Sequence, residues 1–274
     1  MPSIADVAVT PVPARPAATV VLLRDGDDGP EVCLLRRHAR SGFMPDAWVF
    51  PGGTVDPADR RLPRRAWTGY RPAADAARFG GDAHLALGLR VAAVRETFEE
   101  AGILLGRHRD GSPLTPEELA SPRAQAARHG GDFVGWLLAA GIVLDLGALR
   151  YWRRWVTPTS EPRRYDTAFF LARAPHGQEA AHDAEEAIDL RWIRPAVAVA
   201  EADAGRLTLA FPTRRTLREL AAVTDVDRLL ASVGDGPVRA VQPHVLHRAD
   251  GTVTILHPDD PGFPEASRVV RGAW

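Results

Sequence analysis

The chain has 274 residues, of which 45% are hydrophobic, and its formal net charge at pH 7 is -1. This length suffices for one large domain with a real core, and a near-neutral charge without long runs of one sign favours a small soluble ligand over nucleic acid. The sequence shows no signal peptide and no apolar run of about 18 to 20 residues, and its single cysteine, Cys33, excludes an intramolecular disulfide. We therefore expect a cytoplasmic protein that does not bind a membrane.

The first part of the chain predicts an arm, a hairpin and a short strand. Residues 1–15 are rich in proline and alanine, which is typical of a flexible arm. Strand patterns at 17–24 and 31–37 flank the turn-forming segment DGDDGP and predict a hairpin. A short strand at 47–50 then leads into the tripeptide PGG at 51–53, whose composition predicts a tight turn.

The rest of the chain alternates between helical and strand patterns. Residues 60–84 lack clear periodicity and predict an insertion before an amphipathic helix at 85–101, and Thr115 and Glu118 form the capping-box pattern of another helix. After a loop at 107–115, we expect helices at 116–127, 131–140, 195–204 and 213–223, and strands at 149–156, 165–173, 188–193, 244–247 and 252–256. This order predicts an α/β (α+β) protein in which helices cover both faces of a mixed sheet.

Three glutamates gather on one edge of the helix predicted at 85–101. At 100° per residue, Glu96, Glu99 and Glu100 fall within an arc of about 100°, opposite the apolar face. Gly102 predicts that the helix ends directly after them, where its dipole is already negative. A divalent cation would stabilise such a cluster, and oxygen ligands are those that Mg²⁺ or Mn²⁺ prefers, usually together with phosphate. The alternative is a solvated acidic helix face without a ligand.

Two segments, GGTVDPAD and RETFEEAGI, together resemble the two halves of the Nudix box, G-x5-E-x7-R-E-U-x-E-E-x-G-U, in which U is aliphatic. Asp59 stands where the family has its first glutamate, 35 residues separate Asp59 from Arg95 where the family has seven, and Thr97 replaces the first aliphatic residue. The second half is otherwise complete, with Arg95, Glu96, Glu99, Glu100, Gly102 and Ile103 at their expected positions.

The resemblance implies a Nudix-type α/β/α sandwich around a mixed β-sheet at 16–210, with 60–84 inserted in the box. Residues 211–274 then form an extension of helices and short strands that packs on the same domain. The resemblance also implies a hydrolase that uses Mg²⁺ or Mn²⁺ to cleave the pyrophosphate bond of a nucleoside diphosphate linked to another moiety, so the partner is a small-molecule nucleotide. A homodimer is left open, because the insertion suits either a lid or a dimer contact.

The same resemblance gives roles to the residues of the box. Glu96, Glu99 and Glu100 are expected to hold the metal, and the carbonyl group of Gly52 to complete its coordination shell. The absence of a side chain at Gly53 lets the backbone approach the substrate.

Three further roles are less specific. Arg95 is expected to orient Glu96 or Asp59 through a bidentate pair. The partner of the Asp59 carboxylate is therefore either Arg95 or the metal, and the sequence leaves both open. Family members take their general base from a box glutamate or from a distant loop, and in this chain the loop candidates are Glu185 and Glu186. We prefer Glu186, against the alternative of an ordinary acidic loop.

The flanking segments resemble the Nudix branch that contains the peroxisomal coenzyme A diphosphatases, which carry an insertion at the same place. The coenzyme A signature, L-L-T-x-R-[SA]-x3-R-x3-G-x3-F-P-G-G, is met at Leu34, Leu35 and FPGG, but Arg36 occupies its threonine position. Coenzyme A or acyl-coenzyme A is therefore the expected substrate, with ADP-ribose or a dinucleotide as the alternative. A third reading is a noncatalytic Nudix module that senses a nucleotide.

Arginines near the box are candidates for binding the phosphates of the substrate. A guanidinium group matches the geometry of a phosphate, which points to Arg36, Arg37, Arg40 and Arg164. The chain contains no lysine, so all 34 basic residues are arginines, and a single arginine is a weaker indicator than usual. Surface decoration is the competing interpretation for these four.

Overall fold

The computed structural model describes residues 12–40, 44–182, 187–247 and 252–264. Its main element is a mixed sheet with the strand order β10-β2-β1-β9-β8-β11, to which β3 adds beside β2 and β4 beside β1. The pairs β1–β9 and β8–β11 are parallel, and the other pairs are antiparallel. The strands are β1 (Arg15–Gly26), β2 (Gly29–Arg37), β3 (Trp48–Val49), β4 (Gly52–Thr54), β8 (Arg150–Val156), β9 (Tyr165–Arg173), β10 (Ala187–Ile193) and β11 (Ala240–Val241).

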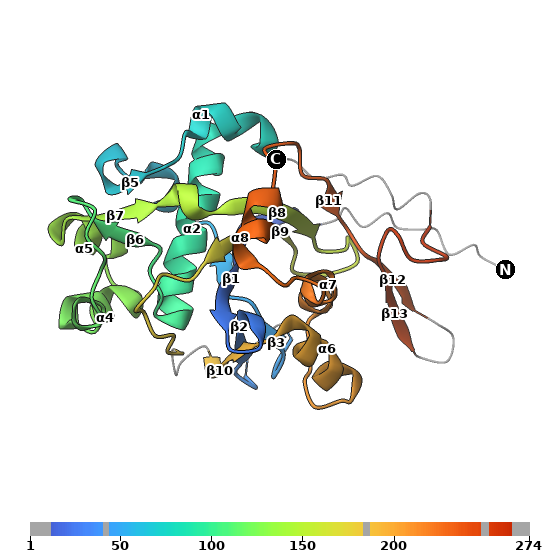
Figure 1. The fold of residues 1–274 in the computed structure, drawn as a ribbon. Coiled ribbons are helices and arrows are strands. Elements are labelled where there is room, and N and C mark those ends of the chain that lie inside the picture. The colour runs from blue at the N-terminus through green and yellow to red at the C-terminus, as the bar shows by residue number, and fades with distance from the viewer. Residues whose placement is uncertain (1–11, 41–43, 183–186, 248–251, 265–274) are drawn as a thin grey trace.

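Helices cover both faces of this sheet, which confirms the predicted sandwich (Figure 1). Alternate residues of β1 face opposite sides: Val20 and Leu22 belong to the core on the side of α2 (Ala83–Ala101), whereas Val21 and Leu23 belong to the core on the other side. This alternation is that of a strand buried on both faces. The second side is covered by α6 (Pro195–Asp203), α7 (Phe211–Leu220) and α8 (Val226–Ser232).

The long helix α2 begins and ends at residues that favour those positions. The side chain of Asp82 accepts hydrogen bonds from the backbone N–H groups of His84 and Leu85, at 2.9 and 3.0 Å, and so caps the first turn. At the other end Gly102 takes the left-handed conformation, with φ of 70°, and donates its N–H to the carbonyl of Phe98. The helix predicted at 85–101 is thereby confirmed, with its start two residues earlier.

The insertion predicted at 60–84 folds against α2 in short elements. A buried guanidinium holds it there: Arg90 of α2, 5% exposed, contacts Asp75 at 3.1 Å and donates to the carbonyls of Leu146 and Leu149. The strand β5 (Trp67–Thr68) pairs with β7 (Ile142–Asp145), which pairs with β6 (Gly106–His108) in a second, three-stranded sheet. The other elements are η1 (Asp59–Arg61), η2 (Arg64–Ala66), α1 (Pro72–Asp75), η3 (Ala76–Phe79) and, after β7, η4 (Leu146–Ala148).

Several predicted boundaries differ from the structure. The helix expected at 116–127 is two helices, because Ser121 starts a new helix with Pro122 in its first turn. The expected loop at 107–115 begins inside β6, and the tight turn expected at 51–53 is instead the start of β4, which pairs with β1. The elements β5, β7, β11 and α8 were not predicted either. The remaining elements agree: α3 (Pro116–Leu119) with its capping box, α4 (Pro122–Arg128), α5 (Phe133–Ala139), β12 (His244–His247) and β13 (Val253–Leu256). No helix in the described ranges is long and apolar enough to cross a membrane.

Candidate active site

The three predicted carboxylates, called here the carboxylate rim (Glu96, Glu99 and Glu100), lie at the C-terminal end of α2 beside the turn that opens β4. The N–H group of Gly52 donates to the carboxylate of Glu100 at 2.8 Å. A Cβ atom at Gly53 would lie 2.5 Å from the carboxyl group of Glu96, so no side chain fits there while that carboxylate is in place. The PGG turn therefore packs directly against the rim.

Arg95 connects the two halves of the split box. Its Nε and Nη2 atoms donate to the two carboxylate oxygens of Asp59, at 3.1 and 3.0 Å, which is a bidentate pair. Its Nη1 atom donates to Glu96 at 2.9 Å and to Glu99 at 2.8 Å, and Nη2 also reaches the carbonyl of Thr54 at 3.0 Å. One guanidinium thus joins the start of the insertion, β4 and two members of the rim.

Burial governs the electrostatics around Arg95. Burial raises the pKa of Asp59 and of Glu99, and the neighbouring Arg95 opposes both shifts. Burial alone would lower the pKa of Arg95, but Asp59, Glu96 and Glu99 outweigh it and raise that pKa, so Arg95 stays a cation. The side chain of Asp59 is only 2% exposed, so this pair sits almost out of water.

The donor set of the rim suits a divalent cation. Across the described ranges of the chain, no three His, Cys, Asp or Glu side chains converge on one point as they stand, since Arg95 attracts Glu96 and Glu99 while Gly52 attracts Glu100. The three side chains nevertheless start from adjacent positions on one helix edge and offer only oxygen atoms. Binding an ion requires them to turn from these partners.

The predicted phosphate-binding arginines lie in different surroundings. Arg36, on β2, lies opposite Trp48 of β3 in the sheet and contacts Asp46 at 3.3 Å. The Nε atom of the neighbouring Arg37 is buried without a hydrogen-bond partner among the described residues. Arg40 is exposed in the loop after β2.

Two predicted residues are not brought to the rim by any described contact. Arg164 is 5% exposed, and its guanidinium donates to the carbonyls of Thr157, Pro158 and Val12, at 3.1, 3.1 and 2.7 Å. The Arg164 guanidinium is thus hydrogen-bonded to the backbone of the protein itself. Its binding to the substrate stays a prediction. Glu186 lies outside the described residues, so its role as the general base also stays a prediction.

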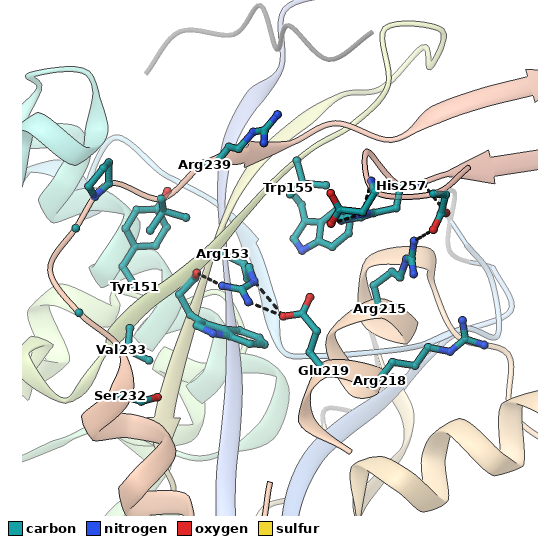
Figure 2. A pocket seen from close by; sticks show the side chains of 18 residues that line it. Tyr151, Arg153, Trp155, Arg215, Arg218, Glu219, Ser232, Val233, Arg239 and His257 are labelled. Carbon is teal, nitrogen blue, oxygen red and sulfur yellow. Dashed lines mark hydrogen bonds and ion pairs between the residues drawn. The ribbon is translucent and has the colours of Figure 1, made fainter. Parts of the chain in front are cut away.

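A cavity of about 960 Å³, which was not predicted, lies at the β8 edge of the sheet, between β8, α7 and residues 232–241. Figure 2 shows Arg153 reaching across it to Glu219, a pair at 2.6 Å, while Arg215 pairs with Asp260. None of the described residues predicted for the site lines this cavity. This cavity therefore lies apart from the carboxylate rim, and the assignment of the chemistry to the rim stays a prediction; a signal for the cavity in the sequence is the concentration of arginine in β8 and α7.

Comparison with known proteins agrees with this geometry. Residues 75–220 match the NUDT19 Nudix domain, and residues 13–123 match the NUDIX domain. The chain is 32% identical to acyl-coenzyme A diphosphatase NUDT19 of Gallus gallus, over 87% of this chain and 76% of that protein, and 29% identical to the Homo sapiens protein of the same name, over 85% and 72%. A solved NUDIX hydrolase from Alicyclobacillus acidocaldarius is 33% identical, with a TM-score of 0.66 over 82% of this chain and 98% of that one. The two family matches and these relatives show that the chain belongs to the Nudix hydrolase family.

Proposed function

We propose that this Nudix hydrolase is a Mg²⁺-dependent diphosphatase that cleaves the pyrophosphate bond of coenzyme A or acyl-coenzyme A. The products are 3′,5′-ADP and 4′-phosphopantetheine or its acyl ester. The observation that carries the reaction is the pairing of Arg95 with Asp59, Glu96 and Glu99, which assembles the box despite the insertion. The substrate rests on the relatives from chicken, frog and human, all named acyl-coenzyme A diphosphatase, and on the partly matched signature at Leu34 and Leu35.

The family uses divalent metals, and Glu96, Glu99 and Glu100, with the carbonyl of Gly52, would hold the ion in this chain. When bound, Mg²⁺ neutralises the charge of the two phosphates and lowers the pKa of a coordinated water. The protein itself keeps the three carboxylates beside the PGG turn: Arg95 pairs with Glu96 and Glu99, and the backbone N–H of Gly52 pairs with Glu100. To hold the ion, the carboxylates would turn from these partners.

Residues outside the rim would hold the substrate and move the proton. Arg36 and Arg37 come from the strand that pairs with β3, next to the PGG turn, and with Arg40 they would bind phosphate groups.

We propose Glu186 as the general base, because it follows a loop and precedes β10. Replacing it by Gln should lower the rate and change the pH profile more than the same change at Glu185.

One experiment tests the substrate. The protein is incubated with Mg²⁺ and separately with coenzyme A, acyl-coenzyme A, ADP-ribose and dinucleotides, and the products are identified by mass. Release of 3′,5′-ADP from coenzyme A is the expected result. Consumption of ADP-ribose alone would establish the alternative substrate. That alternative is open because Arg36 occupies the threonine position of the coenzyme A signature.

A second experiment separates an enzyme from a sensor. In the Glu99→Gln variant, an enzyme loses turnover but still binds its nucleotide, whereas a noncatalytic module shows no turnover before or after the change.

A cytoplasmic location and a homodimer are further predictions, to be checked by cell fractionation and by light scattering.

A further inference from the structure

The C-terminal end of α2 is closed by a side chain that does not belong to the Nudix box. Arg128, the last residue of α4, is 8% exposed. Its Nε atom donates to the carbonyl of Glu99 at 3.0 Å, and its Nη2 atom donates to the carbonyl of Ala181. A Cβ atom at Gly102 would lie 3.3 Å from its guanidinium, so Arg128 rests on the glycine that ends the helix.

The segment that contains Ala181 is attached to the same place by its own hydrogen bonds. The N–H of Ala181 donates to the carbonyl of Ala101 at 2.9 Å. The side chain of Gln178 accepts from the N–H of Leu104 at 2.9 Å and donates to the carbonyl of Leu104 at 3.1 Å. Residues 178–182, the docking segment, therefore follow the chain that leaves α2.

The position of Arg128 suits the charge of this end of the helix. The carbonyl end of α2 carries partial negative charge, and a cation there is favourable. Arg95 acts on the rim through its carboxylates, whereas Arg128 acts on the backbone from which Glu99 projects. The two arginines thus contact the same helical turn, one through a side-chain carboxylate and the other through a backbone carbonyl.

We propose that Arg128 is a positioning residue for the reaction: it fixes the last turn of α2, and with it the carboxylate of Glu99, against the docking segment. The proposal rests on the hydrolase function proposed above. A planar guanidinium can donate to two carbonyls in a fixed geometry, which an ammonium group cannot do. Because Arg128 acts through the rim rather than on the substrate, its loss affects turnover more than binding.

The test compares Arg128→Gln and Arg128→Lys with Arg123→Gln, a matched control at an exposed position of the same helix. We expect kcat to fall about 10- to 100-fold in Arg128→Gln, since a shift of catalytic groups by about 1 Å has such an effect, with KM within about twofold of wild type. Arg128→Lys keeps the charge and should restore only a minor part of kcat. Arg123→Gln should behave as wild type.

Hydrogen exchange of the backbone amides, measured without substrate or metal, provides a readout independent of activity. Peptides that cover 98–105 and 176–182 should exchange faster in both Arg128 variants but not in the control. Because hydrogen exchange needs no turnover, its result remains valid whichever diphosphate the wild-type protein cleaves. If that compound is not coenzyme A, kcat of the variants is measured on it instead.

Several results would overturn the proposal. These are an unchanged kcat in folded Arg128→Gln, a raised KM with kcat unchanged, full recovery of kcat by lysine, or unchanged exchange at 98–105 and 176–182. If Arg128→Gln does not fold, the proposal is tested with Arg128→Lys alone. A kcat equal to that of wild type, or unchanged exchange at 98–105 and 176–182, in this variant would then overturn it.

Discussion

At the scale of single residues, the shortened carboxylate of Asp59 is the main departure from the family pattern. Asp59 lies at the start of η1, which packs against α2, and Asp56 donates its N–H to Asp59 at 2.8 Å. The backbone is thus brought close enough for the shorter side chain to reach Arg95 with both oxygens. The Asp59–Arg95 pair is almost dry, so loss of Arg95 would leave Asp59 as a buried charge, whereas loss of Asp59 leaves Arg95 paired with Glu96 and Glu99.

Replacing Asp59 by Asn should therefore destabilise the fold. Removing one member of an isolated buried ion pair costs about 3 to 5 kcal/mol; because Arg95 keeps two carboxylate partners, we expect a loss of about 1 to 3 kcal/mol, which urea unfolding followed by circular dichroism measures. The control is Asp56→Asn, since its side chain is 59% exposed and lies 3.9 Å from Arg95; an exposed pair contributes about 1 kcal/mol or less. Equal effects of the two substitutions would contradict this account.

Cys33 is a second residue whose behaviour follows from burial. Its side chain is fully buried in β2, and burial raises the pKa of the thiol to about 12. Since the thiolate is the reactive form, a thiol reagent at pH 8 should leave the native protein unmodified and should label one site after unfolding. Rapid labelling of the folded protein would show that β2 opens readily.

At the scale of elements, the site depends on the fit between the PGG turn and the end of α2. Both come from strong sequence signals: the turn residues predicted the first, and the helical period with Gly102 predicted the second. The contacts between them, and those of Arg128 with Glu99 and Ala181, join residues 29 to 53 positions apart. No local pattern encodes such contacts, which explains why the sequence predicted the rim but not Arg128.

Gly53→Ala tests the fit between turn and helix. The added Cβ would lie 2.5 Å from the carboxyl group of Glu96, so that side chain must move and kcat should fall about tenfold or more. Gly236→Ala is the matched control, because a Cβ there meets no atom within 4 Å. Steady-state kinetics with the established substrate measure both, and a kcat in Gly53→Ala equal to that of the control would remove Gly53 from the site.

At the scale of the whole molecule, the sandwich was predictable, and so was the presence of an insertion, but the internal structure of the insertion was not. The hairpin of β1 and β2, helix α2 and the strands β8 to β10 each show the period of their element. The insertion instead folds in pieces of two to four residues, too short for a period to appear, and its strand β5 finds its partner, β7, far along the chain. Non-local pairing of this kind is set by tertiary packing rather than by propensity.

The C-terminal part of the molecule should weaken in acid through His257. Its ring lies 5.6 Å from that of Trp155, and burial, followed by the charge of Arg215, lowers its pKa below the usual 6.5. The unfolded chain therefore takes up this proton first, so the stabilisation is complete above about pH 6.5 and is lost as the pH falls below it. His257→Gln should lose less stability than wild type between pH 7.5 and 5.5 in urea unfolding; parallel losses would exclude His257 as a contributor.

The pairing of Arg95 with Asp59 has a consequence for how the sequence between them can evolve. Lengthening the spacer between the two halves of the motif from seven to 35 residues adds only about 1.4 kcal/mol of closure entropy, because that term grows with the logarithm of length. Residues can therefore be inserted between Asp59 and Arg95 at little entropic cost while the reacting groups keep their places, provided that the new segment packs against α2 as it does here through Asp75 and Arg90.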